Sequence, residues 1–207
     1  MTDTDKTQEI LNFWFQGVND TTVINKKSVP FNQWFMKSEA FDEQIRERFE
    51  ADLVKASQGE YKMWEQTPHG ALALIILFDQ FSRNLYRNTL KMLATDPLAL
   101  ELTLKMIKAG IDEELLLIER AFFYMPLMHA EDLDIQNMSL QCFGDLVEES
   151  KIKNPRNTPY YEYTFDYAKR HQTIIANFNR FPHRNVTLGR VSTSKETAFL
   201  NKPGSLF

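Results

Sequence analysis

Polar residues that could do chemistry interrupt apolar stretches of the sequence at three places. In the first, Asp79 directly follows an apolar run, residues 71–78, and Arg83 stands four positions further on. In a helix these two side chains lie on one side and can pair. An unpaired buried charge is very costly, so Asp79 requires a partner. The pair either fixes helix packing or forms the polar wall of a pocket, in which Arg83 or Arg87 reaches an anion.

The second segment places His129 just before three carboxylates, Glu131, Asp132 and Asp134. Acids in a first helical turn suit the helix dipole, and that alone would explain them. His129 and Asp132, three positions apart, could instead both face inward. As a metal half-site the pattern is weak, because it lacks the His-Glu-x-x-His spacing of zinc peptidases and no second histidine lies within four residues.

The third segment, residues 170–190, holds four arginines and two histidines without a single acid. Its candidate ligand-binding residues are His183, Arg184, Asn185 and Arg190. Guanidinium groups suit bidentate capture of a carboxylate or phosphate. Alternatively, these side chains cap helix ends and pair with acids elsewhere in the chain.

The three segments are expected to meet in space, although each is about 50 residues from the next. Buried charges need partners, and the apolar surroundings of Asp79 offer few besides Arg83. We therefore expect Asp79 or Arg83 to contact residues 129–136 or 180–190. We also expect the arginines of the loop at 179–190 to matter more for a ligand than for the fold.

No recognisable cofactor or metal site accompanies these segments. The single cysteine, Cys142, excludes an internal disulfide and a cysteine-based metal site. No nucleophile elbow, P-loop or dinucleotide fingerprint occurs. A His–Asp–His site using Asp79 would need the histidines to meet it by tertiary chance. The sequence therefore indicates no cofactor, and folding that does not depend on a metal.

The elements that must position these residues are helices. Strand alternation is not clear, and in one stretch apolar residues recur every four positions from Phe41 to Leu53, which is an amphipathic helical stripe. The expected helices cover residues 10–15, 39–57, 68–86, 98–109, 119–124, 131–149 and 160–178.

Local signals mark where these helices begin and end. Thr67 before Pro68 is a hydroxyl N-cap followed by proline at the first helical position. Asp96 before Pro97 repeats the device, and Gly110 closes the helix that they open.

Further signals mark the connections. Pro126 is expected to end a helix, residues 150–159 to form a polar linker, and residues 179–190 to form a loop. Thr193 to Glu196 reads as a capping box ahead of a last short helix.

Length and composition place the chain among globular proteins. Its 207 residues, 43% hydrophobic and 25% charged, suit one helical domain over residues 1–207. Sixteen phenylalanines predict an aromatic-rich core. Helices of this length joined by short connections form antiparallel pairs, as in a bundle or an α-solenoid. No clean 34-residue repeat is present.

Charge and hydropathy limit the partners. Residues 1–150 carry 14 basic and 25 acidic side chains, and residues 151–207 carry 10 and 3, so the C-terminal part either pairs with the rest or offers an anion-binding face. A net charge of −4 argues against nucleic-acid binding. The longest apolar run, eight residues, is too short to span a membrane. The polar N-terminus lacks a signal peptide's apolar core, so a cytoplasmic location is expected. The oligomeric state is not indicated.

Three motifs resemble domain-of-unknown-function family 924. They read Leu77-Phe-Asp-Gln-Phe-x-Arg-Asn, Tyr124-x-Pro-x-x-His-x-Glu-Asp and Arg180-Phe-Pro-His-Arg-Asn-x-x-Leu-Gly-Arg-x-Ser-Thr, and the resemblance covers nearly the whole chain. It implies an all-α fold of the tetratricopeptide-like (TPR-like) α–α superhelix kind, and no established activity. This chain departs from the family pattern at Ser82, Ala130, Asn179 and Val191.

The resemblance singles out the polar motif positions, in addition to Gln80 and Gly189, as the site. The candidate ligand-binding residues are Asp79, Arg83, Asn84, His129, Glu131, Asp132, His183, Arg184, Asn185 and Arg190.

Three functional hypotheses follow. The preferred one is a protein that binds a small anionic molecule or a peptide carboxylate, in a pocket lined by Arg83, His129, His183, Arg184 and Arg190. The second is a hydrolase or a lyase, in which His129 or His183 acts as general base and a buried carboxylate orients it. The third is a protein–protein interaction scaffold, whose polar motifs are satisfied internally and leave no pocket.

Overall fold

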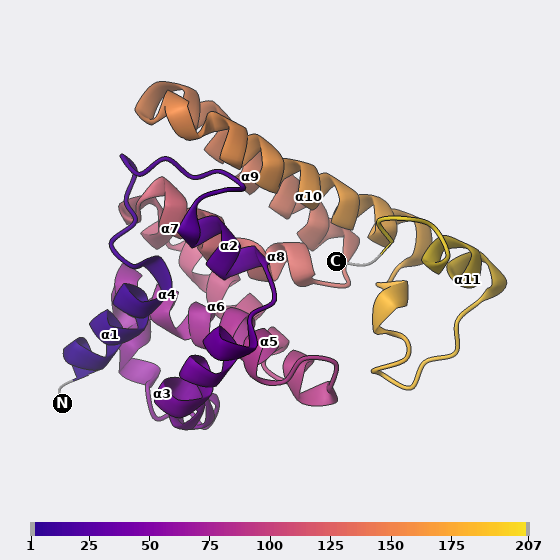
Figure 1. The fold of residues 1–207 in the computed structure, drawn as a ribbon, viewed down its shortest axis with the longest axis horizontal. Coiled ribbons are helices and arrows are strands. Elements are labelled where there is room, and N and C mark those ends of the chain that lie inside the picture. The colour runs from indigo at the N-terminus through magenta and orange to yellow at the C-terminus, as the bar shows by residue number, and fades with distance from the viewer. Residues whose placement is uncertain (1–2, 206–207) are drawn as a thin grey trace.

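The computed structural model describes residues 3–205; Met1 and Thr2 of the polar N-terminus and the last two residues lie outside them. Within residues 3–205 every regular element is a helix, so the all-α fold is confirmed (Figure 1). The α-helices are α1 Asp3–Phe15, α2 Val29–Phe35, α3 Glu39–Ser57, α4 Pro68–Ile75, α5 Ser82–Leu85, α6 Asp96–Lys108, α7 Leu117–Phe123, α8 Met125–His129, α9 Leu133–Lys153, α10 Thr158–Phe178 and α11 Ser194–Leu200. Short 3₁₀ or π segments are η1 Lys62–Gln66, η2 Ile76–Phe81, η3 Leu90–Leu93, η4 Ile111–Glu114, η5 Pro155–Asn157 and η6 Pro182–Arg184.

The helix that carries the first motif begins as predicted. The Thr67 hydroxyl accepts the Gly70 N–H, and Pro68 occupies the first turn. The helical course then continues to α5, as expected, but η2 is π-helical rather than α-helical. A π-turn widens the helix by one residue and is frequent at functional sites. In this chain the widened turn contains Asp79 and Gln80.

Side chains satisfy the backbone carbonyls around the widened turn. The carbonyl oxygen of Phe78 accepts hydrogen bonds from the hydroxyls of Ser82 and Thr95, each at 2.6 Å. The Asp79 carbonyl accepts from Arg83 Nη1 at 2.7 Å. Because buried carbonyls need partners, these hydroxyl and guanidinium donors stabilise the turn that presents the Asp79 side chain.

The expected end of a helix near Pro126 is confirmed, since α7 ends at Phe123. Pro126 itself stands in the first turn of α8, where a proline needs no N–H partner. One expected helix start is wrong by a residue. Asp96 does not act as the N-cap of α6: Thr95 holds that position, and Asp96 is the first helical residue. Its carboxylate is turned toward Arg83 instead of capping the helix.

The polar linker expected at residues 150–159 is also wrong, since α9 runs to Lys153 and α10 already begins at Thr158. The polar side chains there form hydrogen bonds both within a helix and between segments. Ser150 Oγ donates to the Val147 carbonyl inside α9. Asn157 accepts the N–H of Ile24 at 2.8 Å, which holds the loop before α2 against the α9–α10 connection.

Aromatic side chains form most of the core, as the composition predicts. Trp14 and Phe122 are almost fully buried and meet edge to face, with ring centroids 5.5 Å apart. Antiparallel α9 and α10 lie along one side of the body formed by the earlier helices (Figure 1). A smaller apolar cluster, Ile174, Ile175 and Phe181, joins the end of α10 to the C-terminal segment. The single-domain interpretation and the TPR-like superhelix stay predictions.

No helix among the described residues has both the length and the apolar character needed to cross a membrane.

Candidate functional site

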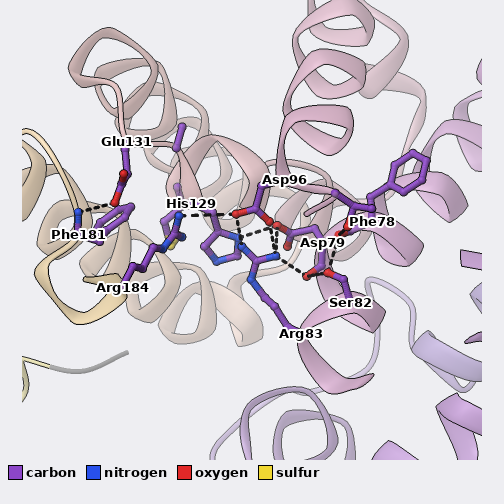
Figure 2. A network of polar contacts seen from close by, with 12 residues as sticks. Phe78, Asp79, Ser82, Arg83, Asp96, His129, Glu131, Phe181 and Arg184 are labelled. Atoms are coloured by element: carbon purple, nitrogen blue, oxygen red, sulfur yellow. Dashed lines mark hydrogen bonds and ion pairs between the residues drawn. The ribbon is translucent and has the colours of Figure 1, made fainter. Parts of the chain in front are cut away.

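The first two motifs meet at a buried carboxylate. Asp79 Oδ1 lies 2.7 Å from Nδ1 of His129, at the end of α8, and 3.0 Å from Arg83 Nη1 (Figure 2). Asp79 Oδ2 accepts a hydrogen bond from Gln80 at 2.5 Å. Arg83 also forms a bidentate pair with Asp96, at 2.9 and 3.2 Å. The expected contact between Asp79 and residues 129–136 is therefore confirmed.

Burial and charge determine the protonation of this network. Burial alone would raise the pKa of the Asp79 carboxyl, but Arg83 and His129 outweigh it and hold that pKa well below its usual value. Burial, followed by the charge of Arg83, lowers the pKa of His129. At neutral pH Asp79 is thus ionised and His129 neutral. An ionised carboxylate only accepts, so His129 donates its Nδ1–H and keeps Nε2 as an acceptor.

A cavity of about 370 Å³ adjoins this network, and we call it the first cavity. Its polar lining includes Lys37, Arg83, Asn84, Arg87 and His129, and none of its described lining residues is an acid. The carboxylates that pair with these cations lie outside the lining. The first cavity therefore presents cationic and neutral donor groups to an occupant.

The rest of the lining of the first cavity is largely apolar and aromatic. Met125 and Met128 of α8 contribute sulfur-bearing side chains, and Tyr163, Tyr167 and His171 follow one another at four-residue spacing along α10. That spacing puts the three rings on one helix face. Methionine adapts its shape to irregular partners, and aromatic faces offer a large contact area.

A second cavity, of about 380 Å³, lies on the other side of His129. Its charged lining consists of Asp79, Asp96, Glu131, Asp132 and Arg184. His129 lines both cavities, so the Asp79–His129 pair stands between them.

The third motif reaches the second through ion pairs. Arg190 binds Glu131 with both Nη atoms, at 2.6 and 2.9 Å, and Glu131 also accepts the Phe181 N–H at 2.8 Å. Arg184 Nη1 lies 3.6 Å from Asp96 Oδ2 (Figure 2). The rival explanation, in which acids at the start of α9 neutralise the loop arginines, therefore holds for Arg190.

The single pocket expected from the sequence is divided. The first cavity contains Arg83 and His129, the second contains His129 and Arg184, and neither is lined by His183 or Arg190. His183 packs its ring against Phe181 with centroids 5.5 Å apart, and burial, followed by the charge of Arg184, lowers its pKa to about 4.

Three further candidates have structural partners. Asp132 is exposed and caps α9 by accepting the Ile135 N–H, so it is not buried beside His129, although both residues line the second cavity. Asn185 is buried and donates to Ser192 Oγ. Asn84 lines the first cavity and donates to Asp42, which also binds Arg87 in bidentate fashion.

Sequence reasoning missed several lining residues. Asp96 is predicted only as a helix start, and Lys37 stands in no motif. Asp42, which binds Arg87 from outside the lining, stands in no motif either. The four-residue spacing of Tyr163 and Tyr167 was a usable signal for a common face, but the spacing does not tell which helix that face meets.

These features define the chain as an all-α protein with a buried Asp–His–Arg network between two cavities. It belongs to the family described as bacterial protein of unknown function (DUF924), whose model matches residues 10–204. The resemblance carried by the three motifs is thereby confirmed. A solved structure of ATU0120, a protein of unknown function from Agrobacterium tumefaciens, is 32% identical with a TM-score of 0.78. That match covers 97% of this chain and 99% of the other. No curated protein matches.

Proposed function

We propose that this protein binds a small amphipathic anion in the first cavity, namely a carboxylate attached to an aromatic or acyl group. One observation carries the proposal: the lining combines cations, without any described acid, with methionine and aromatic side chains. Ligand pockets typically pair an apolar wall with a few placed polar groups, and 370 Å³ lies in their usual size range.

The donors left over by internal pairing identify the groups that would hold the anion. Arg87 gives Nε and Nη2 to Asp42, which leaves Nη1 for a ligand. Lys37 forms a 3.5 Å ion pair with the exposed Glu39, and no closer ionic partner is found among the described residues. Arg83 is engaged by two aspartates, so it contributes mainly charge. Lys37 and Arg87 are thus the expected carboxylate contacts.

A thermal-shift titration with benzoate and octanoate tests the proposal, with benzamide as a neutral analogue. Binding to the native state raises the free energy of unfolding by about 2.7 kcal/mol at one hundred times Kd. We expect both carboxylates, but not benzamide, to raise Tm. Arg87→Gln and Lys37→Gln should each reduce the shift, and Lys108→Gln, which removes an exposed lysine at the end of α6, should not. Equal shifts for benzoate and benzamide would reject anion binding.

A second candidate function rests on the Asp79–His129 pair. A neutral histidine, with Nδ1–H held by a buried carboxylate and Nε2 left as an acceptor, is the arrangement of a general base. His129 also lines the first cavity, with its side chain 17% exposed. In a hydrolase, Nε2 would take a proton from water as the water attacks a carbonyl carbon, and would return it to the leaving group. The two cavities favour either function over a scaffold that needs no pocket.

Hydrolysis of p-nitrophenyl acetate and p-nitrophenyl benzoate tests this candidate. General-base catalysis contributes roughly a hundred- to ten-thousand-fold to rate. We expect His129→Gln to abolish nearly all release of p-nitrophenol, and His69→Gln, at a half-exposed histidine outside both cavities, to leave it unchanged. Equal rates for the wild-type protein and His129→Gln would reject hydrolysis and leave binding as the function.

A further inference from the structure

Arg184 holds its guanidinium in an unusual environment within the second cavity. The side chain is only 11% exposed, and it lines this cavity together with Asp96 and His129. The guanidinium carbon lies 4.7 Å from the centre of the Phe181 ring, which covers one face of the group. Arg184 is held by η6, a short 3₁₀ turn, so the loop after α10 fixes its position.

The hydrogen-bonding capacity of Arg184 is unused within the described residues. Its guanidinium makes one ion pair, with Asp96 Oδ2 at 3.6 Å, and one ring contact with Phe181. A separation of 3.6 Å is too long for a hydrogen bond. Arginine has five N–H donors, so several remain for a bound group. By contrast, Arg83 and Arg190 each bind a carboxylate in bidentate fashion.

The acids that line the second cavity are already occupied. Asp79 binds Arg83, His129 and Gln80. Asp96 is shared, because its close bidentate pair is with Arg83 and Arg184 stands further off. Arg184 therefore competes with Arg83 for a carboxylate that is already taken.

Glu131 and Asp132 complete the acidic lining, and they too are engaged. Glu131 is held by both Nη atoms of Arg190, and Asp132 caps α9 from the exposed side. The charge of Arg184 is thus the least compensated in the second cavity.

These acids do not fully compensate the burial of Arg184. Burial and the charge of Arg83 lower the pKa of the Arg184 guanidinium, although Asp96, Glu131 and Asp79 act in the opposite direction. An anion bound against the guanidinium would offset part of what burial costs its charged form.

We propose that the second cavity is a separate binding site for an oxyanion, a carboxylate or a phosphate, held by the guanidinium of Arg184. The planar fork offers two parallel N–H donors to two oxygens of the anion. The Phe181 ring restrains the group, so little side-chain freedom is lost on binding. The site does not depend on the first cavity being occupied, although His129 borders both.

Calorimetric titration with inorganic phosphate and with acetate tests this site and distinguishes the two sources of oxyanion. Hydrogen bonds to charged groups contribute about 1.5–3 kcal/mol, which corresponds to roughly a ten- to hundredfold change in Kd. We expect Arg184→Met to weaken the better-bound anion by that factor. Arg156→Met, which removes an exposed arginine in η5, is the matched control for net charge and should leave Kd unchanged.

Two further variants keep the result interpretable. Arg184→Lys retains the charge but not the fork, so it should keep phosphate binding better than acetate binding. Arg87→Gln impairs the first cavity only, so it should leave phosphate binding intact even if no aromatic carboxylate binds there. Equal Kd values for the wild-type protein, Arg184→Met and Arg184→Lys would overturn the proposal, and so would the absence of saturable binding of either anion.

Discussion

His129 Nδ1 and Asp79 Oδ1 lie 2.7 Å apart although 50 residues separate them in the sequence. Asp79 is fully buried, and its π-helical turn directs the carboxylate toward the end of α8. Burying an ionised carboxylate is costly unless charged and hydrogen-bonding partners surround it. Asp79 has three such partners, and through Arg83 it is linked to Asp96 at the start of α6. The network thus joins three helices of the body.

Replacing Asp79 by Asn should destabilise the fold strongly. The amide removes the negative charge that Arg83 and His129 face, and breaking a buried pair from one side costs about 3–5 kcal/mol. The matched control is Asp166→Asn, because Asp166 pairs with Arg170 on the surface at 2.7 Å, where such a pair is worth about 1 kcal/mol or less. Urea denaturation measures both variants. Equal losses in the two would contradict a structural role for the buried network.

Acidification should destabilise the protein through its buried histidines. The folded-state pKa is about 4 for His183 and about 3 for His171, mainly because of burial, while an unfolded histidine titrates near 6.5. Between these values the unfolded chain binds more protons than the folded one. The free energy of unfolding is therefore highest above about pH 6.5 and falls as pH falls toward 4.

Thermal melts between pH 7.5 and 5 measure this dependence. His183→Gln should flatten the curve, because it removes one of the buried histidines whose pKa is lowered. A slope that is the same in His183→Gln as in the wild-type protein would show that other groups cause the loss.

How far the sequence predicts this site can be seen residue by residue. The Asp79–His129 contact is predictable because a buried carboxylate restricts its partners to very few groups. The exposed position of Asp132 could not be predicted in the same way. The N-terminus of α9 requires a cap, and this requirement outweighs any attraction between Asp132 and His129. Asp96 before Pro97 predicts the start of a helix. That the Asp96 carboxylate binds Arg83 instead of capping this helix depends on a tertiary contact, which the local sequence does not show.

The fold follows the same logic. Helices with strong periodicity, such as α3 at Glu39–Ser57, are predicted to the residue from their apolar spacing. In the structure the Ser38 side chain accepts the Phe41 N–H and caps the start of this helix. The linker predicted at residues 150–159 is wrong because a polar composition does not imply exposure. Asn157 is buried and is hydrogen-bonded to the loop before α2. The π-turn has no local signal, because the hydroxyls that stabilise it come partly from Thr95, 17 residues away from the carbonyl that it binds.

Arg190 and Arg184 should differ in their effect on stability. Arg190 holds Glu131 with two hydrogen bonds, and both side chains are about a quarter exposed. Removing Arg190 leaves Glu131 without its counter-ion, so Arg190→Met should cost on the order of 1–3 kcal/mol. Arg184→Met should cost less than Arg190→Met, because no hydrogen bond to a described residue is lost. Chemical denaturation compares the two, and a larger loss for Arg184→Met would assign Arg184 to the fold.

Chelation should leave stability unchanged. The described residues contain no group of three or more His, Cys, Asp or Glu side chains arranged to hold a metal ion. Excess EDTA is therefore expected to leave Tm as it was. A drop of several degrees that zinc reverses would reveal a structural metal and contradict the sequence-based expectation.

The hydroxyl of Thr95 should stabilise the π-turn measurably, and Thr103 provides a matched control. Thr95 Oγ1 donates to the Phe78 carbonyl at 2.6 Å, beside the Asp79 peptide. Thr103 is also buried but donates to the Phe123 carbonyl at 3.3 Å, outside the network. Valine matches the shape of threonine, so each substitution removes one hydrogen bond and leaves a buried carbonyl with one partner fewer. Thr95→Val should cost about 1–3 kcal/mol, and Thr103→Val less, because its bond is longer.

The two variants should also differ at the network itself. If the turn positions Asp79, Thr95→Val will change the Nδ1–H resonance of His129 in the proton NMR spectrum, since that proton is shared with the Asp79 carboxylate. Thr103→Val should lose stability without changing that resonance. The same His129 signal in both variants, together with equal losses of stability, would mean that Thr95 serves packing alone and that the turn keeps Asp79 in place without it.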